Sequence, residues 1–82
     1  MWVHENNQLT RTFVFSDFVE AFGFMTQVAL LVEKHDHHPT WSNTYNQVTI
    51  EFTTHDAGNQ VTEKDYAIAK QIDQLLRSTS LS

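Results

Sequence analysis

A chain of 82 residues is long enough for one domain, and a domain of this size buries only about 60% of the surface that its unfolded chain exposes. Ten acidic against five basic side chains give a formal charge of -5, so the chain lacks the positive field that attracts nucleic acid or anionic lipid. Because there is no cysteine, disulfides and thiolate sites are excluded, which fits a reducing cytoplasm. We expect one domain over residues 1–82, in the cytoplasm, that binds neither nucleic acid directly nor a membrane.

Two extended segments open the chain. Residues 9–15 are rich in Thr, Phe and Val, with Leu9, Arg11, Phe13 and Phe15 on one face. A shorter extended piece at residues 2–5 can pair with them through Asn6-Asn7, because asparagine tolerates positive φ better than most residues. The pattern predicts a β-hairpin.

A change of period after this hairpin predicts a helix that starts from Ser16 as N-cap and ends near Lys34 or His35. One apolar stripe recurs at spacings of three and four and consists of Phe18, Phe22, Met25, Ala29 and Val32. A second stripe makes the apolar arc wider than one sheet face needs, and it consists of Phe24, Val28 and Leu31. We expect the second stripe to be an interface between identical subunits, in a homodimer or a homotetramer.

The second half of the chain contains another strand and another helix. Val48, Ile50 and Phe52 alternate with polar residues, which predicts a strand with one face on the core. A loop over residues 56–60 follows, and Thr62 then caps a helix whose buried stripe is Ile68, Ile72 and Leu75. The order strand, strand, helix, strand, helix predicts an α+β fold in which an antiparallel sheet carries both helices on one face.

Four of the five histidines lie in two short segments, His35-Asp36-His37-His38-Pro39 and His55. Pro39 disfavours the α region for His38 and therefore ends the first helix before it. His55 continues the parity of Thr49, Glu51 and Thr53 on the outward face of the strand, if the strand extends that far. Both segments can then meet at one edge of the sheet.

Three interpretations of this histidine cluster are open. The side chains can be solvated surface histidines, or ligands of a metal ion, for which neutral imidazole is a common donor. Metal binding is disfavoured because the spacing matches no helical His-Glu-x-x-His motif and adjacent residues of an extended chain point to opposite sides. The third interpretation is general acid–base catalysis, for which histidine, with an ordinary pKa of about 6.5, is the only unperturbed side chain that titrates near neutral pH.

The residues around the histidines resemble the signature of the pterin-4a-carbinolamine dehydratases. The resemblance lies in Glu33-Lys34-His35-Asp36-His37-His38-Pro39-Thr40-Trp41, Tyr45-Asn46-Gln47-Val48, Thr53-Thr54-His55 and Thr62-Glu63-Lys64-Asp65. It implies a hydro-lyase that removes water from 4a-hydroxytetrahydropterin, the product of pterin-dependent aromatic amino acid hydroxylases, with neither metal nor cofactor. The resemblance further implies that His37, His38 and His55 are catalytic. It implies substrate-binding positions at Asp36, Pro39, Trp41, Thr53, Thr54, Asp56 and Asp65.

Two other functions are compatible with the same sequence. Relatives of this family also stabilise the dimer of a homeodomain transcription factor, and the wide apolar arc of the first helix would then be a docking surface for a protein. A further alternative is a related accessory role in pterin or molybdopterin chemistry. The grouped histidines favour the enzyme, because a binding module has no need for three titratable groups at one sheet edge.

Overall fold

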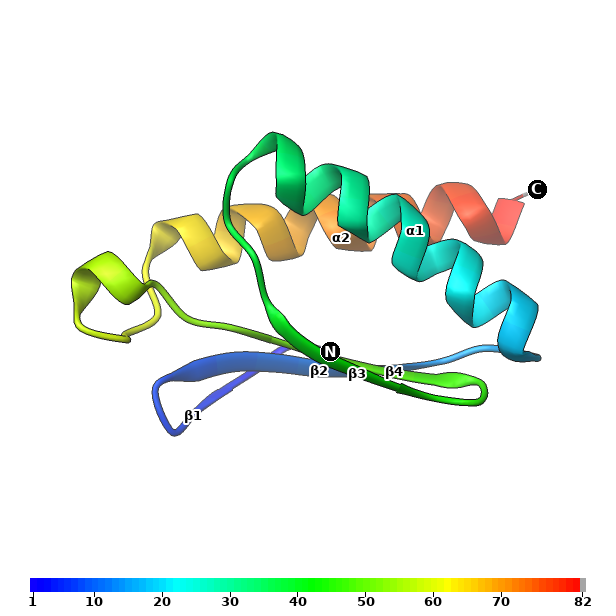
Figure 1. Ribbon diagram of the computed structural model, residues 1–82, viewed down its shortest axis with the longest axis horizontal. Coiled ribbons are helices and arrows are strands. Elements are labelled where there is room, and N and C mark those ends of the chain that lie inside the picture. The colour runs from blue at the N-terminus through cyan, green and yellow to red at the C-terminus, as the bar shows by residue number, and fades with distance from the viewer. Residues whose placement is uncertain (82) are drawn as a thin grey trace.

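The computed structural model describes the backbone of residues 1–81 and the side chains of residues 1–77. In chain order the elements are β1 (Val3–Glu5), β2 (Gln8–Val14), α1 (Phe18–Lys34), β3 (Thr40–Thr44), β4 (Gln47–Phe52), the short 3₁₀ helix η1 (His55–Ala57) and α2 (Glu63–Leu81). The four strands form one antiparallel sheet in the order β1-β2-β4-β3. Both helices lie on the same face of this sheet (Figure 1), which confirms the predicted α+β class. None of the helices in residues 1–81 is long and apolar enough to cross a membrane.

The predicted hairpin and the predicted turn are present. Asn6 and Asn7 connect β1 to β2 with φ angles of 53° and 60°, in the left-handed region that asparagine tolerates. Leu9 and Phe13 of β2 face the helices and are buried. Thr10, Thr12 and the exposed Val14 of β2 lie on the other face of the strand, away from the helices.

β3 was not predicted. It pairs antiparallel with β4 along its whole length, and Trp41 lies opposite Ile50 on the core side. Its sequence, Thr-Trp-Ser-Asn-Thr, contains a single apolar residue, so it carries no alternation that periodicity could detect. Pairing with a buried neighbour, and not its own pattern, makes this segment a strand.

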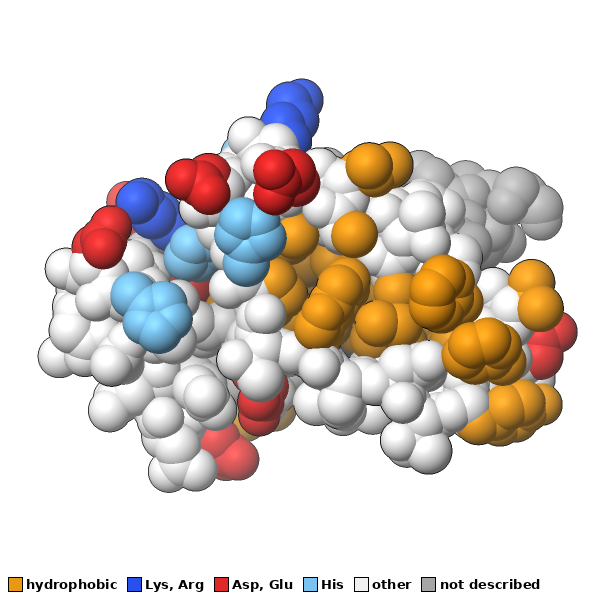
Figure 2. All heavy atoms as spheres, viewed as in Figure 1, with side chains coloured by type: hydrophobic (Ala, Val, Ile, Leu, Met, Phe, Trp, Pro, Cys, Tyr) orange, Lys and Arg blue, Asp and Glu red, His pale blue; other side chains and the backbone are white. Residues whose placement is uncertain are grey.

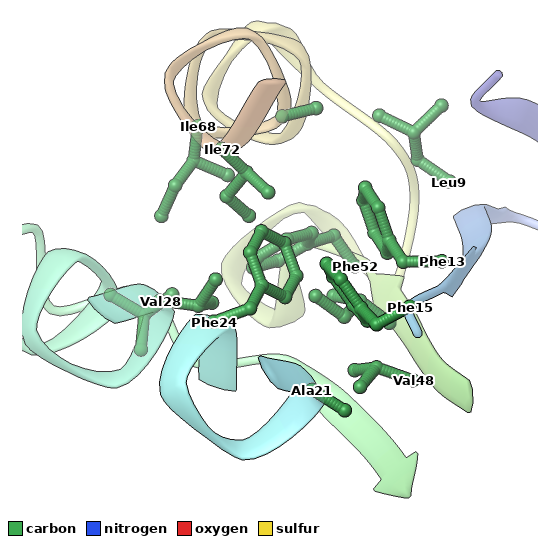
Figure 3. Close-up of a cluster of buried hydrophobic side chains, with 13 residues drawn as sticks. Leu9, Phe13, Phe15, Ala21, Phe24, Val28, Val48, Phe52, Ile68 and Ile72 are labelled. Carbon is green, nitrogen blue, oxygen red and sulfur yellow. The ribbon is translucent and has the colours of Figure 1, made fainter. Parts of the chain in front are cut away.

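The core lies between the sheet and the two helices (Figure 3), where aromatic side chains of β2, β4 and α1 meet Ile68 and Ile72 of α2. The rings of Phe13 and Phe24 have centroids 4.8 Å apart, and those of Phe15 and Phe24 are 5.0 Å apart. Of the predicted α2 stripe, Ile68 and Ile72 are buried, and Leu75 is partly buried against the core.

The buried face of α1 takes residues from both stripes. The side chains that α1 buries against the sheet are Ala21, Phe24, Val28 and Val32. Phe18 and Phe22 of the first stripe are 46% and 54% exposed. The prediction that Phe24 and Val28 form a subunit interface is therefore wrong, since adjacent stripes have the same period and periodicity alone does not tell which one faces the sheet. The N-cap is also one residue later than predicted, because the Asp17 side chain accepts the Glu20 N–H at 2.8 Å.

Candidate active site

The end of α1 places the first histidines. Asp36 has a φ of 48°, and its N–H donates to the Glu33 carbonyl at 3.2 Å, while the His37 N–H donates to the Val32 carbonyl at 3.1 Å. This pair of bonds is the Schellman pattern, in which a left-handed residue closes the helix. The turn ties the backbone of His37 to the last turn of α1, and Figure 1 shows the chain running from there to the sheet.

The His37 side chain is held on two sides. Its ring stacks on the buried ring of Phe52, with centroids 5.5 Å apart and an interplanar angle of 7°. Its Nε2 lies 2.6 Å from Oδ1 of Asp65, which is fully buried. Because a carboxylate only accepts hydrogen bonds, Nε2 carries the hydrogen, and Nδ1 is the nitrogen that a neutral His37 has available as an acceptor.

Asp65 joins this histidine to the start of α2. Its second oxygen accepts from the Thr54 hydroxyl at 2.8 Å and from the Thr62 N–H at 2.8 Å, which is the backbone half of a capping box. Asp65 is buried beside the site and bonds to two side chains, His37 and Thr54, so its predicted contact with a substrate stays a prediction. Burial of this residue does not follow from the sequence pattern, in which Asp65 is simply an acid in a first helical turn.

His38 has a carboxylate partner of its own. Its Nε2 lies 2.8 Å from Oε1 of Glu33, and its Nδ1 is 4.0 Å from Oδ1 of Asp36. This pair is solvated, since the His38 and Glu33 side chains are 53% and 79% exposed. Glu33 was not among the predicted site residues. It precedes His38 by five positions, and only the reversal of the chain after α1 brings the two together.

The second segment reaches the site from the end of β4. The strand ends at Phe52, so His55 does not continue its outward parity as predicted but begins η1. Thr54 is buried and fixes the segment, because its N–H donates to the Gln60 carbonyl at 2.9 Å and its hydroxyl bonds to Asp65. His55 is exposed, and its ring has no hydrogen-bond partner within the described part of the chain.

The two segments border one pocket of about 300 Å³, lined by Asp36, His37, His38, Thr53, Thr54, His55, Asp56 and Lys64. The predicted catalytic histidines and four of the predicted binding residues are thus brought together. In Figure 2 the histidines lie on one end of the visible face, beside acidic side chains.

Pro39 and Trp41 do not line this pocket, and Trp41 packs against the core instead. Lys64 lines it without having been predicted. In residues 1–81 no three His, Cys, Asp or Glu side chains are grouped so that they could hold a metal ion.

Asp36 adopts a backbone conformation that glycine accepts at lower cost. We expect Asp36→Gly to raise the free energy of unfolding by up to about 1 kcal/mol, because a left-handed φ strains a residue with a Cβ atom. Asp36→Asn should leave the free energy of unfolding nearly unchanged, since asparagine also tolerates this region. Urea denaturation of the three proteins measures both effects. A destabilised Asp36→Gly variant would contradict the assignment of Asp36 as the helix-closing residue.

Comparison with known proteins shows the family of this chain. The family model described as pterin 4 alpha carbinolamine dehydratase matches residues 1–75. The chain belongs to this family. A relative from Prochlorococcus marinus (strain NATL2A), classed with the pterin-4-alpha-carbinolamine dehydratases, is 51% identical over 77 residues, which are 94% of this chain and 80% of the relative. A relative of the same class from Rhodospirillum rubrum is 56% identical over 68 residues, covering 83% of this chain and 70% of that one.

Two solved structures share the fold of this family member. A crystal structure from Brucella melitensis, described as a transcriptional coactivator/pterin dehydratase, has a TM-score of 0.82 and 45% identity, and the match covers 89% of this chain and 79% of that chain. A pterin dehydratase-like protein described as a RuBisCO assembly factor in the alpha-carboxysome has a TM-score of 0.75 over 92% of this chain and 86% of that one. Its identity is 21%, so it shows similarity of fold alone.

Proposed function

We propose that this protein dehydrates 4a-hydroxytetrahydropterin to quinonoid dihydropterin and water, by general acid–base catalysis with histidines. The observation that carries the proposal is the single pocket on which His37, His38 and His55 converge from two separate segments. In this elimination the C4a–O bond breaks and the hydroxyl leaves as water after gaining a proton. Ring nitrogen N5 loses its proton, and the electron pair forms the C4a=N5 double bond. Nothing is oxidised or reduced, so the reaction needs acids and bases and no electron carrier.

The hydrogen bonds of the site support a division of roles. His37 is the residue best prepared to accept the N5 proton, because Asp65 and Phe52 fix its ring and leave Nδ1 as the free acceptor. His55 has no protein partner among residues 1–77 and can turn toward the departing hydroxyl as the acid. His38, which is held by Glu33, forms a hydrogen bond with the pterin ring as donor or acceptor.

The physiological role that we propose is recycling of the pterin cofactor, tetrahydrobiopterin or a close analogue, after aromatic amino acid hydroxylation. The elimination also proceeds without enzyme, so the benefit lies in rate. Faster dehydration removes the carbinolamine before it can undergo side reactions.

The experiment that tests the proposed function is a dehydration assay with freshly generated carbinolamine, in which the absorbance of the quinonoid product is followed. We expect the rate to rise in proportion to protein concentration, well above the spontaneous rate. Free imidazole at the molarity of the protein's histidines serves as the control for simple buffer catalysis. A rate equal to that of the imidazole control at every protein concentration would refute the proposed function.

We also propose that the protein is a homo-oligomer. Its subunit interface would be the exposed stripe of α1 that contains Phe18 and Phe22. Phe18 and Phe22 are exposed there with ring centroids 5.7 Å apart, and Met25 of the same helix is half-buried. Figure 2 shows hydrophobic side chains gathered along this side of the molecule, over α1 and the adjoining edge of the sheet. A single 82-residue chain has little core to stabilise it, so covering this stripe with a second copy contributes stability.

Light scattering at micromolar concentration is expected to give a mass that is a multiple of 9.5 kDa. Phe22→Glu should shift the mass toward the monomer, because it places a charge in the buried interface. Gln27→Glu adds the same charge on another face of α1 and should leave the mass unchanged. A wild-type protein that is monomeric under these conditions would contradict the proposed assembly.

A further inference from the structure

A second pocket, of about 390 Å³, adjoins the candidate active site at the end of the sheet. Thr53 and His55 line both pockets, so these two residues form the boundary between them. The remaining walls come from the β1–β2 turn, the start of β3 and the loop after η1. Figure 1 shows the turn and this loop at the same end of the molecule.

The walls of this second pocket are polar and mostly uncharged. Side-chain amides line it at Asn6, Asn7, Gln8 and Asn59, and a hydroxyl lines it at Thr40. Within residues 1–77 none of these side chains has a hydrogen bond to another protein group. Each amide offers both a donor and an acceptor, and neither is used inside the protein.

Thr53 adds an independent observation. Its hydroxyl oxygen is buried and has no hydrogen-bond partner within the described part of the chain. A buried hydroxyl without a partner costs free energy, and such groups are uncommon in folded proteins. Rotation of the side chain about χ1 exchanges its methyl and hydroxyl groups, and the boundary between the two pockets is where a ligand oxygen would reach that hydroxyl.

We propose that this second pocket is a subsite for a hydroxylated substituent of the pterin ring, and that it determines substrate preference. The inference rests on the proposed function. The main pocket, at about 300 Å³, lies at the lower end of the range of ligand sites, roughly 300–1,000 Å³, so a ring that fills it leaves the substituent outside. Neutral amides and hydroxyls suit a chain of hydroxyl groups, whereas a charged chain would find no opposite charge there.

A third pocket, next to the candidate active site, suits an apolar substituent. Beyond His37 lies a pocket of about 300 Å³ that includes Ala67 and Ile68 in its lining. His37 and Lys64 line both this pocket and the main one, and the His37 ring is held by Asp65 and Phe52. An apolar substituent is expected to bind in that pocket. A preference for hydroxylated or for apolar substituents therefore shows which pocket the enzyme uses.

The test compares two carbinolamines, one with a 6-methyl group and one with a 6-(1,2-dihydroxypropyl) chain. In the wild-type protein we expect kcat/KM for the dihydroxypropyl compound to be about tenfold higher, the effect of one or two net hydrogen bonds. Asn59→Gly and Asn7→Gly should bring this ratio close to one while leaving kcat/KM for the methyl compound unchanged. Glycine is the chosen replacement because both asparagines have left-handed φ angles, of 60° each, which glycine adopts without strain.

Gln27→Ala, on the exposed surface of α1, is the matched control and should keep the wild-type ratio. A ratio near one in the wild-type protein, a preference for the methyl compound, or an unchanged ratio in both glycine variants would each overturn the subsite. All three of these outcomes leave the proposed function intact, since both compounds are still dehydrated. Failure to dehydrate either compound would instead refute the proposed function, and the subsite with it.

Discussion

Asp65→Ala is expected to lower the free energy of unfolding by about 3–5 kcal/mol, since each buried donor that is left unsatisfied costs about 1–3 kcal/mol. The substitution removes the acceptor of His37 Nε2, the Thr62 N–H and the Thr54 hydroxyl, of which the last also lies 2.8 Å from Thr62 Oγ1. Small domains have a total stability of about 5–15 kcal/mol, so this variant is expected to be partly unfolded near 37 °C. Thermal and urea denaturation measure the loss.

Asp65→Asn separates the effect on catalysis from the effect on folding. The amide keeps the shape of the side chain and one acceptor oxygen, so we expect a smaller loss of about 1–3 kcal/mol. It no longer holds the His37 ring in one tautomer, and kcat should fall by at least tenfold with little change in KM. Asp73→Asn is the matched control on the same helix, because Asp73 accepts from Trp2 Nε1 at 2.9 Å and from Arg11 at 2.8 Å, away from the pocket. That variant should lose stability and keep kcat; a similar fall of kcat in both variants would contradict a specific role of Asp65 in positioning His37.

His37→Ala and His55→Ala are expected to lower the dehydration rate by about 10²–10⁴-fold each, the usual contribution of a positioned acid or base. His38→Ala should have a smaller effect, because its ring is solvated and is assigned a binding role. His4→Ala is the control, since His4 lies on β1 and bonds to Tyr66, outside the pocket. Rates are measured on protein shown to be folded by circular dichroism and are compared with the spontaneous rate. Wild-type rates in all three pocket variants would refute the assignment of these residues as the acid and the base.

Much of the fold follows from local pattern. The alternation of Val48, Ile50 and Phe52, the asparagine turn and the stripe at Ile68 and Ile72 each specify an element by their own spacing, and each is found where predicted. The missed strand β3 and the wrong assignment of Phe24 and Val28 to an interface have a common cause. In both cases the sequence is compatible with two arrangements, and contact with β4 selects one of them.

The sequence predicted which residues line the site, but it did not predict the hydrogen bonds between them. The lining histidines, Asp36 and Thr53 were expected together because two short segments carry the resemblance to the family. The carboxylate partners of the histidines differ, since Glu33 reaches His38 across the end of α1 and Asp65 reaches His37 from another helix. The first pair depends on the reversal of the chain after α1 and the second on the packing of α2, and no local spacing encodes either.

We propose that imidazoles from two segments surround one planar ligand. A titration with an oxidised pterin, which cannot be dehydrated, tests this arrangement through the ring ¹⁵N signals of the histidines. We expect the signals of His37, His38 and His55 to shift together with a single midpoint while the signal of His4 stays in place. Shifts confined to one of the three rings, or three shifts with separate midpoints, would contradict a shared site.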